Sequence, residues 1–190
     1  MNENIEILGR YSIDSNPAVN KDKTKWMLVS TPQLDRVHSL DEKQLFLSYN
    51  GSNLERIRVK KLLGVYMDNH LLWNEHVVMT LSSCYSTLAV LRKFRHTAPL
   101  QIRKQLIECL NFSKLDYCSL VLNYLPVYQV KRLQRLQNAC AAFVLGKYAN
   151  MNEVLKFRWL PVHERRELNL LKLVHKSLYV TVPEKLTPVF

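Results

Sequence analysis

The sequence lacks the motifs that several classes of protein require. Its 190 residues include only four glycines, and none stands in a glycine-rich phosphate loop or a Gly-x-Ser-x-Gly nucleophile motif. The four cysteines form no Cys-x-x-Cys pair and have no zinc-knuckle spacing with a histidine. The sequence therefore indicates no phosphate loop, serine nucleophile or zinc site, and we expect the cysteines to be buried thiols.

Long apolar runs are missing as well. No stretch approaches the roughly eighteen residues of a membrane-spanning helix. The first residues, Met1 to Asn4, are acidic and lack the apolar core of a signal peptide. These features predict an intracellular protein, in the cytoplasm or the nucleus.

Positive charge is what the chain has in excess. Its formal net charge is +11 and its isoelectric point is near 9.6. Residues 99–179 carry most of the excess, with 13 lysines and arginines against 5 aspartates and glutamates. Because basic side chains release counterions when they meet phosphate groups, a polyanion is the expected partner.

The first part of the chain mixes helix and strand signals. The patterns predict a helix at 3–11, a strand at 25–30, a loop or short helix at 33–43, a hairpin at 44–59 and a strand at 61–67. The hairpin is expected to turn at Asn50-Gly51, a dipeptide that suits a tight two-residue turn. Within the last strand, Gly64 indicates a bulge or a close backbone approach.

From Trp73 onward the apolar period changes from two to about 3.6, which indicates helices. They are predicted at 74–94, 99–120, 126–145 and 161–179. Three of them begin at a proline, where the missing N–H costs little, and Gly146 is suited to end the third. The expected fold class is therefore α+β, with a helical second half.

Two of these helices carry basic stripes. In helix 126–145, Lys131, Arg135 and Asn138 lie opposite an apolar face. Helix 161–179 is predicted to have a polar stripe that faces outward, formed by Arg165, Asn169, Lys172 and Lys176. Its predicted inward side is apolar and consists of Leu168, Leu171, Val174 and Leu178. Either the stripes contact phosphate groups or they are solvated faces that keep a helical bundle soluble.

Groups for catalysis are scarce. His70 and His76 flank Trp73 and Glu75, but the spacing is not His-Glu-x-x-His and no third ligand is evident, so no metal site is predicted. The carboxylate pairs that are close in sequence, Asp68 with Glu75 and Asp41 with Glu42, are expected to be caps and surface charges.

Two stretches about forty residues apart resemble a known family. Asn20, Lys23, Thr24 and Met27 resemble the late palm motif of jockey-like non-LTR retrotransposon reverse transcriptases, and residues 62–76 resemble the last palm hairpin and the start of the thumb. The resemblance runs from about residue 1 to residue 180 and is strongest after residue 60. Each motif is weak alone, and their order and spacing make the set specific.

The resemblance implies roles for individual residues. By this analogy Lys23 would help to protonate the pyrophosphate leaving group, provided that a complete palm is present. The alternative is a solvated loop lysine. Leu63, Gly64, Val65 and Asp68 would form the hairpin that holds the primer's 3′ end near the active site.

Further matches lie in the helical part. Trp73 and His76 match the residues that open the thumb, and residues 115–118, 133–139 and 159–166 resemble the thumb and post-thumb region. The resemblance thus implies a partial palm at 1–72, a helical thumb and post-thumb at 73–180, and a tail at 181–190.

The family's catalytic aspartates are absent, so the resemblance implies a fragment without its two-metal centre. No cofactor is expected in this chain, and Mg²⁺ only in a complete polymerase with an additional N-terminal portion. The expected activity is sequence-independent binding of an RNA–DNA or RNA template-primer duplex through Lys131, Arg135, Arg165, Lys172 and Lys176. The alternatives are a helical protein-interaction module and a functionless retroelement relic.

Overall fold

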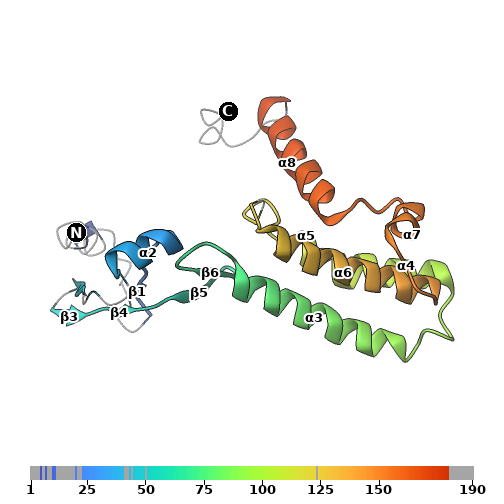
Figure 1. Cartoon of the computed structure of the whole chain (residues 1–190), viewed down its shortest axis with the longest axis horizontal. Coiled ribbons are helices and arrows are strands. Elements are labelled where there is room, and N and C mark those ends of the chain that lie inside the picture. The colour runs from blue at the N-terminus through green and yellow to red at the C-terminus, as the bar shows by residue number, and fades with distance from the viewer. Residues whose placement is uncertain are drawn as a thin grey trace. The chain divides into compact units, whose positions relative to one another are not determined.

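The computed structural model describes residues 5, 7, 10, 11, 20, 23–40, 43, 45–49, 51–122 and 124–179 (Figure 1). The chain divides into two compact units, residues 1–75 and 76–190. Short strands and helices are both present, so the fold is α+β as predicted. The predicted helix at 3–11 falls mainly outside the described residues, and the predicted tail at 181–190 falls wholly outside them.

The elements with described bounds in the first unit are very short strands and the helix α2. In chain order these are β1 (Lys25–Trp26), α2 (Pro32–His38), β2 (Ser48–Tyr49), β3 (Ser52–Asn53), β4 (Glu55–Arg56), β5 (Val59–Leu62) and β6 (Val65–Asp68). Among the described residues the strands form three two-stranded sheets, in which β1 pairs with β4 in parallel, while β2–β3 and β5–β6 are antiparallel.

The Asn50-Gly51 hairpin is confirmed, although its strands are shorter than predicted. Tyr49 pairs with Ser52, and Gly51 has a φ of 71°, the left-handed conformation that a tight turn needs. The strand predicted at 25–30 is paired only over β1. At 33–43 the short-helix alternative holds, because α2 occupies Pro32–His38 with the Thr31 side chain as its cap.

The single strand predicted at 61–67 was wrong. This segment is a hairpin in which Leu62 pairs with Val65 and the two residues between them turn the chain. Both have positive φ angles, 47° at Leu63 and 87° at Gly64. The pattern missed the turn because a leucine in the left-handed region has no sequence signature.

The second unit is helical. From His76 on, it contains all but the first two residues of α3 (Asn74–Arg92), followed by α4 (Leu100–Ile107), the π-helical turn η1 (Glu108–Phe112), α5 (Ser113–Asp116), α6 (Val127–Leu145), α7 (Met151–Lys156) and α8 (Val162–Tyr179). Since α4, η1 and α5 follow one another without a break, they form one helix with a π-turn inside it. No helix among the described residues is both long and apolar enough to cross a membrane.

All four predicted helices are present, with small differences at their ends. The second stops at Asp116 instead of residue 120. The short helix α7 was not predicted, although its cap was visible in the sequence: the Asn150 side chain accepts a hydrogen bond from the Glu153 backbone N–H at 3.2 Å. The π-turn was not predicted either.

The core of the helical unit lies where α3, the α4–α5 helix and α6 contribute buried side chains. On α3 the spacing is three or four residues, which keeps them on one side; the set is Val77, Leu81, Cys84, Leu88 and Leu91. On α6 the matching set is Leu133, Leu136, Cys140, Phe143 and Val144. The α4–α5 helix adds Ile107, Phe112 and Leu115, all buried.

We expect Gly146→Ala to destabilise the helical unit by about 1–2 kcal/mol, since Gly146 ends α6 with a φ of 80°. A Cβ there would lie 2.7 Å from a terminal guanidinium nitrogen of Arg95, which donates a hydrogen bond to the Gly146 carbonyl. Urea unfolding followed by circular dichroism measures the effect. Lys147→Ala, at the exposed neighbouring position, is the control, and equal midpoints for the two variants would contradict the expectation.

Candidate nucleic-acid interface

The basic stripe of α6 lies where the sequence predicts it. Lys131 and Arg135 are exposed, while Leu133 and Leu136 are buried on the opposite side. Asn138 departs from the stripe because it is half-buried and its Oδ1 accepts a hydrogen bond from Gln134 Nε2 at 3.0 Å. The stripe therefore presents two cations from this helix.

The predicted orientation of α8 was wrong. Leu171 is 64% exposed, and Leu168 and Leu178 are exposed too, whereas Arg166 is only 5% exposed. The helix packs through polar side chains: Asn169 Nδ2, for example, donates to Ser119 Oγ at 3.1 Å. The hydrogen-bond partners of the polar side chains of α8 lie on other helices of the unit, so the periodicity of the α8 sequence alone cannot predict them.

Arg165 does not lie on an outward stripe. Its Nη1 donates to Asp116 Oδ2 at 2.9 Å, and its guanidinium sits 4.1 Å from the centre of the Phe112 ring. Of the cations predicted on α8, only Lys172 and Lys176 are exposed without a partner in the described part of the chain. Arg165 thus packs α8 against the α4–α5 helix.

Arg166 is a second structural arginine on the same helix. Its Nη1 donates to the Leu122 carbonyl at 3.1 Å. Burial lowers the pKa of this guanidinium to about 10, and the opposing attraction of Asp116 only partly offsets the effect. At neutral pH the group remains charged and is held inside the unit.

A groove of about 440 Å³ runs beside α8. Its lining comes from the α4–α5 helix, the segment 158–160 and the first half of α8, and includes Phe112, Trp159 and Lys172. Its two carboxylates are already engaged, because Glu108 Oε1 accepts from Trp159 Nε1 at 2.7 Å and Asp116 pairs with Arg165.

The groove adds a cation that the sequence analysis missed. Arg158 lines it, and its side chain has no polar partner among the described residues. It lies just after α7 with a φ of 60°. No local signal marks this arginine, since its position depends on the turn between α7 and α8. With Lys172, it supplies the groove's uncompensated positive charge.

The first unit places Lys23 in a turn before β1. The Lys23 backbone N–H donates to Asn20 Oδ1 at 3.1 Å, and Thr24 Oγ1 donates to the Asn20 carbonyl at 2.8 Å. Within the described ranges no group of histidine, cysteine or carboxylate side chains could hold a metal ion. The role that the resemblance implies for Lys23 remains a prediction.

The four hairpin residues have different environments. Leu63 at the tip is 85% exposed and Val65 is buried. The buried Asp68 has a structural task, because its Oδ1 accepts hydrogen bonds from the backbone N–H groups of His70 at 3.1 Å and Leu72 at 2.9 Å. Asp68 therefore fixes the chain between the hairpin and α3.

The two histidines lie in separate structural settings. His70 Nδ1 lies 3.1 Å from the Ser30 carbonyl oxygen, and its Nε2 lies 3.2 Å from Asp35 Oδ2. His76 is buried on α3, and its pKa is lowered by burial and, secondarily, by the charge of Arg166. Their positions agree with structural roles.

Comparison with protein-family models, curated proteins and solved structures finds no match to this chain.

The lowered pKa of His76 makes stability depend on pH. The unfolded chain binds a proton near the ordinary value of 6.5, whereas the folded chain does so only at lower pH. The stabilisation from neutral His76 is therefore complete above about 6.5 and is lost as the pH falls toward the folded pKa, with a slope of at most about 1.4 kcal/mol per pH unit. His76→Gln should flatten urea-derived stabilities between pH 7 and 5. The exposed His163→Gln is the control, and identical profiles for the two variants would argue against this role.

Proposed function

We propose that this chain is a fragment of an RNA-directed DNA polymerase of a non-LTR retrotransposon whose helical unit binds a template-primer duplex without sequence preference. The observation that carries the proposal is the set of exposed cations on α6 and α8: Lys131, Arg135, Lys172 and Lys176. Cations placed on a folded surface gain affinity for a phosphate backbone from counterion release.

The charge balance of the unit supports this proposal. Between residues 76 and 147 there are ten lysines and arginines and only two acids, Glu108 and Asp116. Both acids are held by hydrogen bonds to Trp159 and Arg165. The positive field of the surface is therefore little compensated in this region. The proposed role is binding and not primer extension, since the sequence carries none of the family's paired aspartates.

The proposal is tested by charge reversal at Arg135 and Lys172. Both are exposed and neither makes a polar contact within the described ranges, so Arg135→Glu with Lys172→Glu should leave folding intact. We expect binding of a labelled RNA–DNA primer-template to weaken by tenfold or more at about 50 mM salt. The slope of log affinity against log salt should also become shallower, by about 0.9 per lost phosphate contact.

A control of equal charge separates this effect from a loss of net charge. Lys60→Glu with Lys93→Glu removes the same two positive charges and adds the same two negative ones at exposed positions on β5 and just after α3, where neither side chain makes a polar contact within the described ranges. Fluorescence anisotropy at about 50 and 200 mM salt compares the two double variants. Equal losses in both would contradict a localised interface.

A second candidate function is protein interaction, and the outward apolar side of α8 favours it. Leu171 and Leu178 are exposed. A second copy of α8 packed antiparallel would cover this apolar side, so self-association is the form this function takes.

Sedimentation tests the second candidate. If α8 pairs with a second copy, the chain should form dimers that persist at high salt, and Leu171→Gln should shift the equilibrium toward monomer. Leu155→Gln, at an exposed leucine on α7, is the control. A chain that is monomeric at every concentration and salt tested would rule out this pairing.

A further inference from the structure

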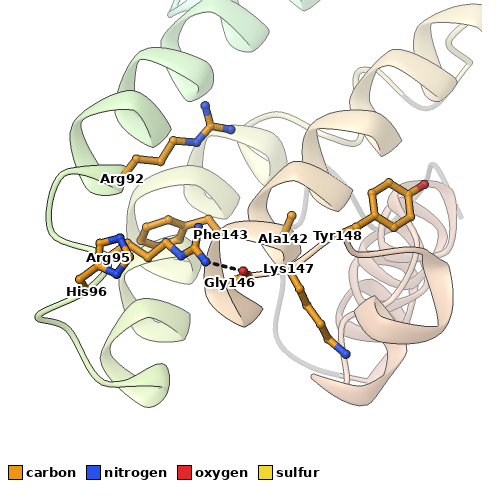
Figure 2. A pocket seen from close by; sticks show the side chains of 8 residues that line it. All are labelled: Arg92, Arg95, His96, Ala142, Phe143, Gly146, Lys147 and Tyr148. Atoms are coloured by element: carbon orange, nitrogen blue, oxygen red, sulfur yellow. Dashed lines mark hydrogen bonds between the residues drawn. The ribbon is translucent and has the colours of Figure 1, made fainter.

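A second hollow in the helical unit is basic and has no assigned role. Figure 2 shows side chains from the end of α3 and the following segment on one side, and from α6 and the following segment on the other. The hollow has a volume of about 430 Å³ and is lined by Arg92, Arg95, His96, Ala142, Phe143, Gly146, Lys147 and Tyr148. None of these residues is an acid.

Part of this basic character has a structural explanation. The last carbonyls of a helix carry partial negative charge and lack partners within the helix. Arg95 donates to the Gly146 carbonyl (dashed line in Figure 2), and Arg103 Nη1 lies 3.4 Å from the Phe143 carbonyl oxygen. These two arginines therefore cap the C-terminus of α6. Lys147 is accounted for too, because it pairs with Glu153 at 3.4 Å.

Arg92 and His96 are not explained by capping. Both are exposed at the rim, and neither side chain makes a hydrogen bond or an ion pair with the part of the chain that the structure describes. The Arg92 guanidinium adds positive charge to a hollow that already contains Arg95, and the His96 ring adds a polar group. Like charges that share a concave surface repel one another, and a bound anion relieves that repulsion.

An aromatic residue at the rim indicates which kind of anion the hollow would bind. Tyr148 is 86% exposed and follows directly after Lys147. Because this ring is open to solvent and also lines the hollow beside the arginines, it is available to stack on a base. Cations combined with a free aromatic face are the pattern of single-strand binding, since an unpaired base is needed for stacking.

We propose that this hollow binds single-stranded nucleic acid, with a phosphate group beside Arg92, Arg95 and His96 and the adjacent base stacked on Tyr148. It deepens the proposed function, on which it rests, by adding a contact for an unpaired strand to the duplex-binding cations of α6 and α8. Arg95 has a double task there, because it also holds the end of α6.

The test measures anisotropy of a labelled twelve-nucleotide single strand with the full chain. Arg92→Gln and Tyr148→Ala remove one feature each and leave the Arg95 cap in place. Lys93→Gln removes the same charge at the adjacent exposed residue, which does not line the hollow. Tyr124→Ala removes a tyrosine that is 92% exposed elsewhere.

We expect Arg92→Gln and Tyr148→Ala each to weaken single-strand binding by about fivefold or more, and the controls by less than about twofold. Tyr148→Ala should leave duplex affinity unchanged. Equal losses in test and control variants would overturn the proposal. So would a mononucleotide that binds as tightly as the twelve-nucleotide strand, because the hollow would then be a nucleotide site.

The Arg135→Glu, Lys172→Glu variant separates this inference from the proposed function. If that variant loses duplex binding and keeps single-strand binding that depends on Tyr148, both proposals stand. If wild-type chain binds no duplex but binds single strands through Arg92 and Tyr148, the proposed duplex interface fails and the single-strand site stands. If single strands bind independently of both residues, the inference fails whatever the duplex result.

Discussion

The helical unit depends on the buried amide of Asn111. Its Nδ2 lies 3.4 Å from the Cys84 carbonyl oxygen on α3 and 3.3 Å from Cys140 Sγ on α6, so one side chain on the α4–α5 helix joins three helices. Asn111 lies within the π-turn η1, where the extra residue per turn changes the direction of the side chains that follow. A buried Nδ2 donor without these partners would cost about 1–3 kcal/mol, which favours this packing of the three helices over alternatives.

The same π-turn determines where α8 packs. Glu108 at its start accepts the hydrogen bond from Trp159, and Phe112 at its end makes an edge contact with Trp159, with ring centres 4.6 Å apart. Phe112 also lies under the Arg165 guanidinium. The first residue of α8 is held by α6, because Gln134 Oε1 accepts a hydrogen bond from the Val162 backbone N–H at 3.0 Å. The position of Lys172 at the groove follows from these contacts.

Sequence periodicity was reliable where apolar side chains form the core and failed where polar ones do. The helices α3 and α6 were predicted because their buried residues are leucine, valine, phenylalanine and cysteine at helical spacing. In α8 the spacing predicts inward leucines, yet the helix buries Arg166 and exposes Leu171. An arginine can be buried when a carbonyl such as that of Leu122 satisfies it, and such a partner is known only from the fold.

The candidate site, like the fold, was predicted only in part. The sequence does not show which arginines bond to other groups of the protein and which stay exposed. Arg103, Arg165 and Arg166 bond to carbonyls or to Asp116 and so hold helices together, while Arg95 does the same and also lines the second hollow. The exposed lysines and arginines whose side chains lack such bonds are available to contact a phosphate group; on the helical unit they include Arg92, Lys131, Arg135, Lys172 and Lys176. The net charge of +11 does not distinguish cations that bond within the protein from cations that stay exposed, because it counts both equally. The division explains why α8 offers Lys172 and Lys176 to solvent but not Arg165, although the sequence places all three on one stripe.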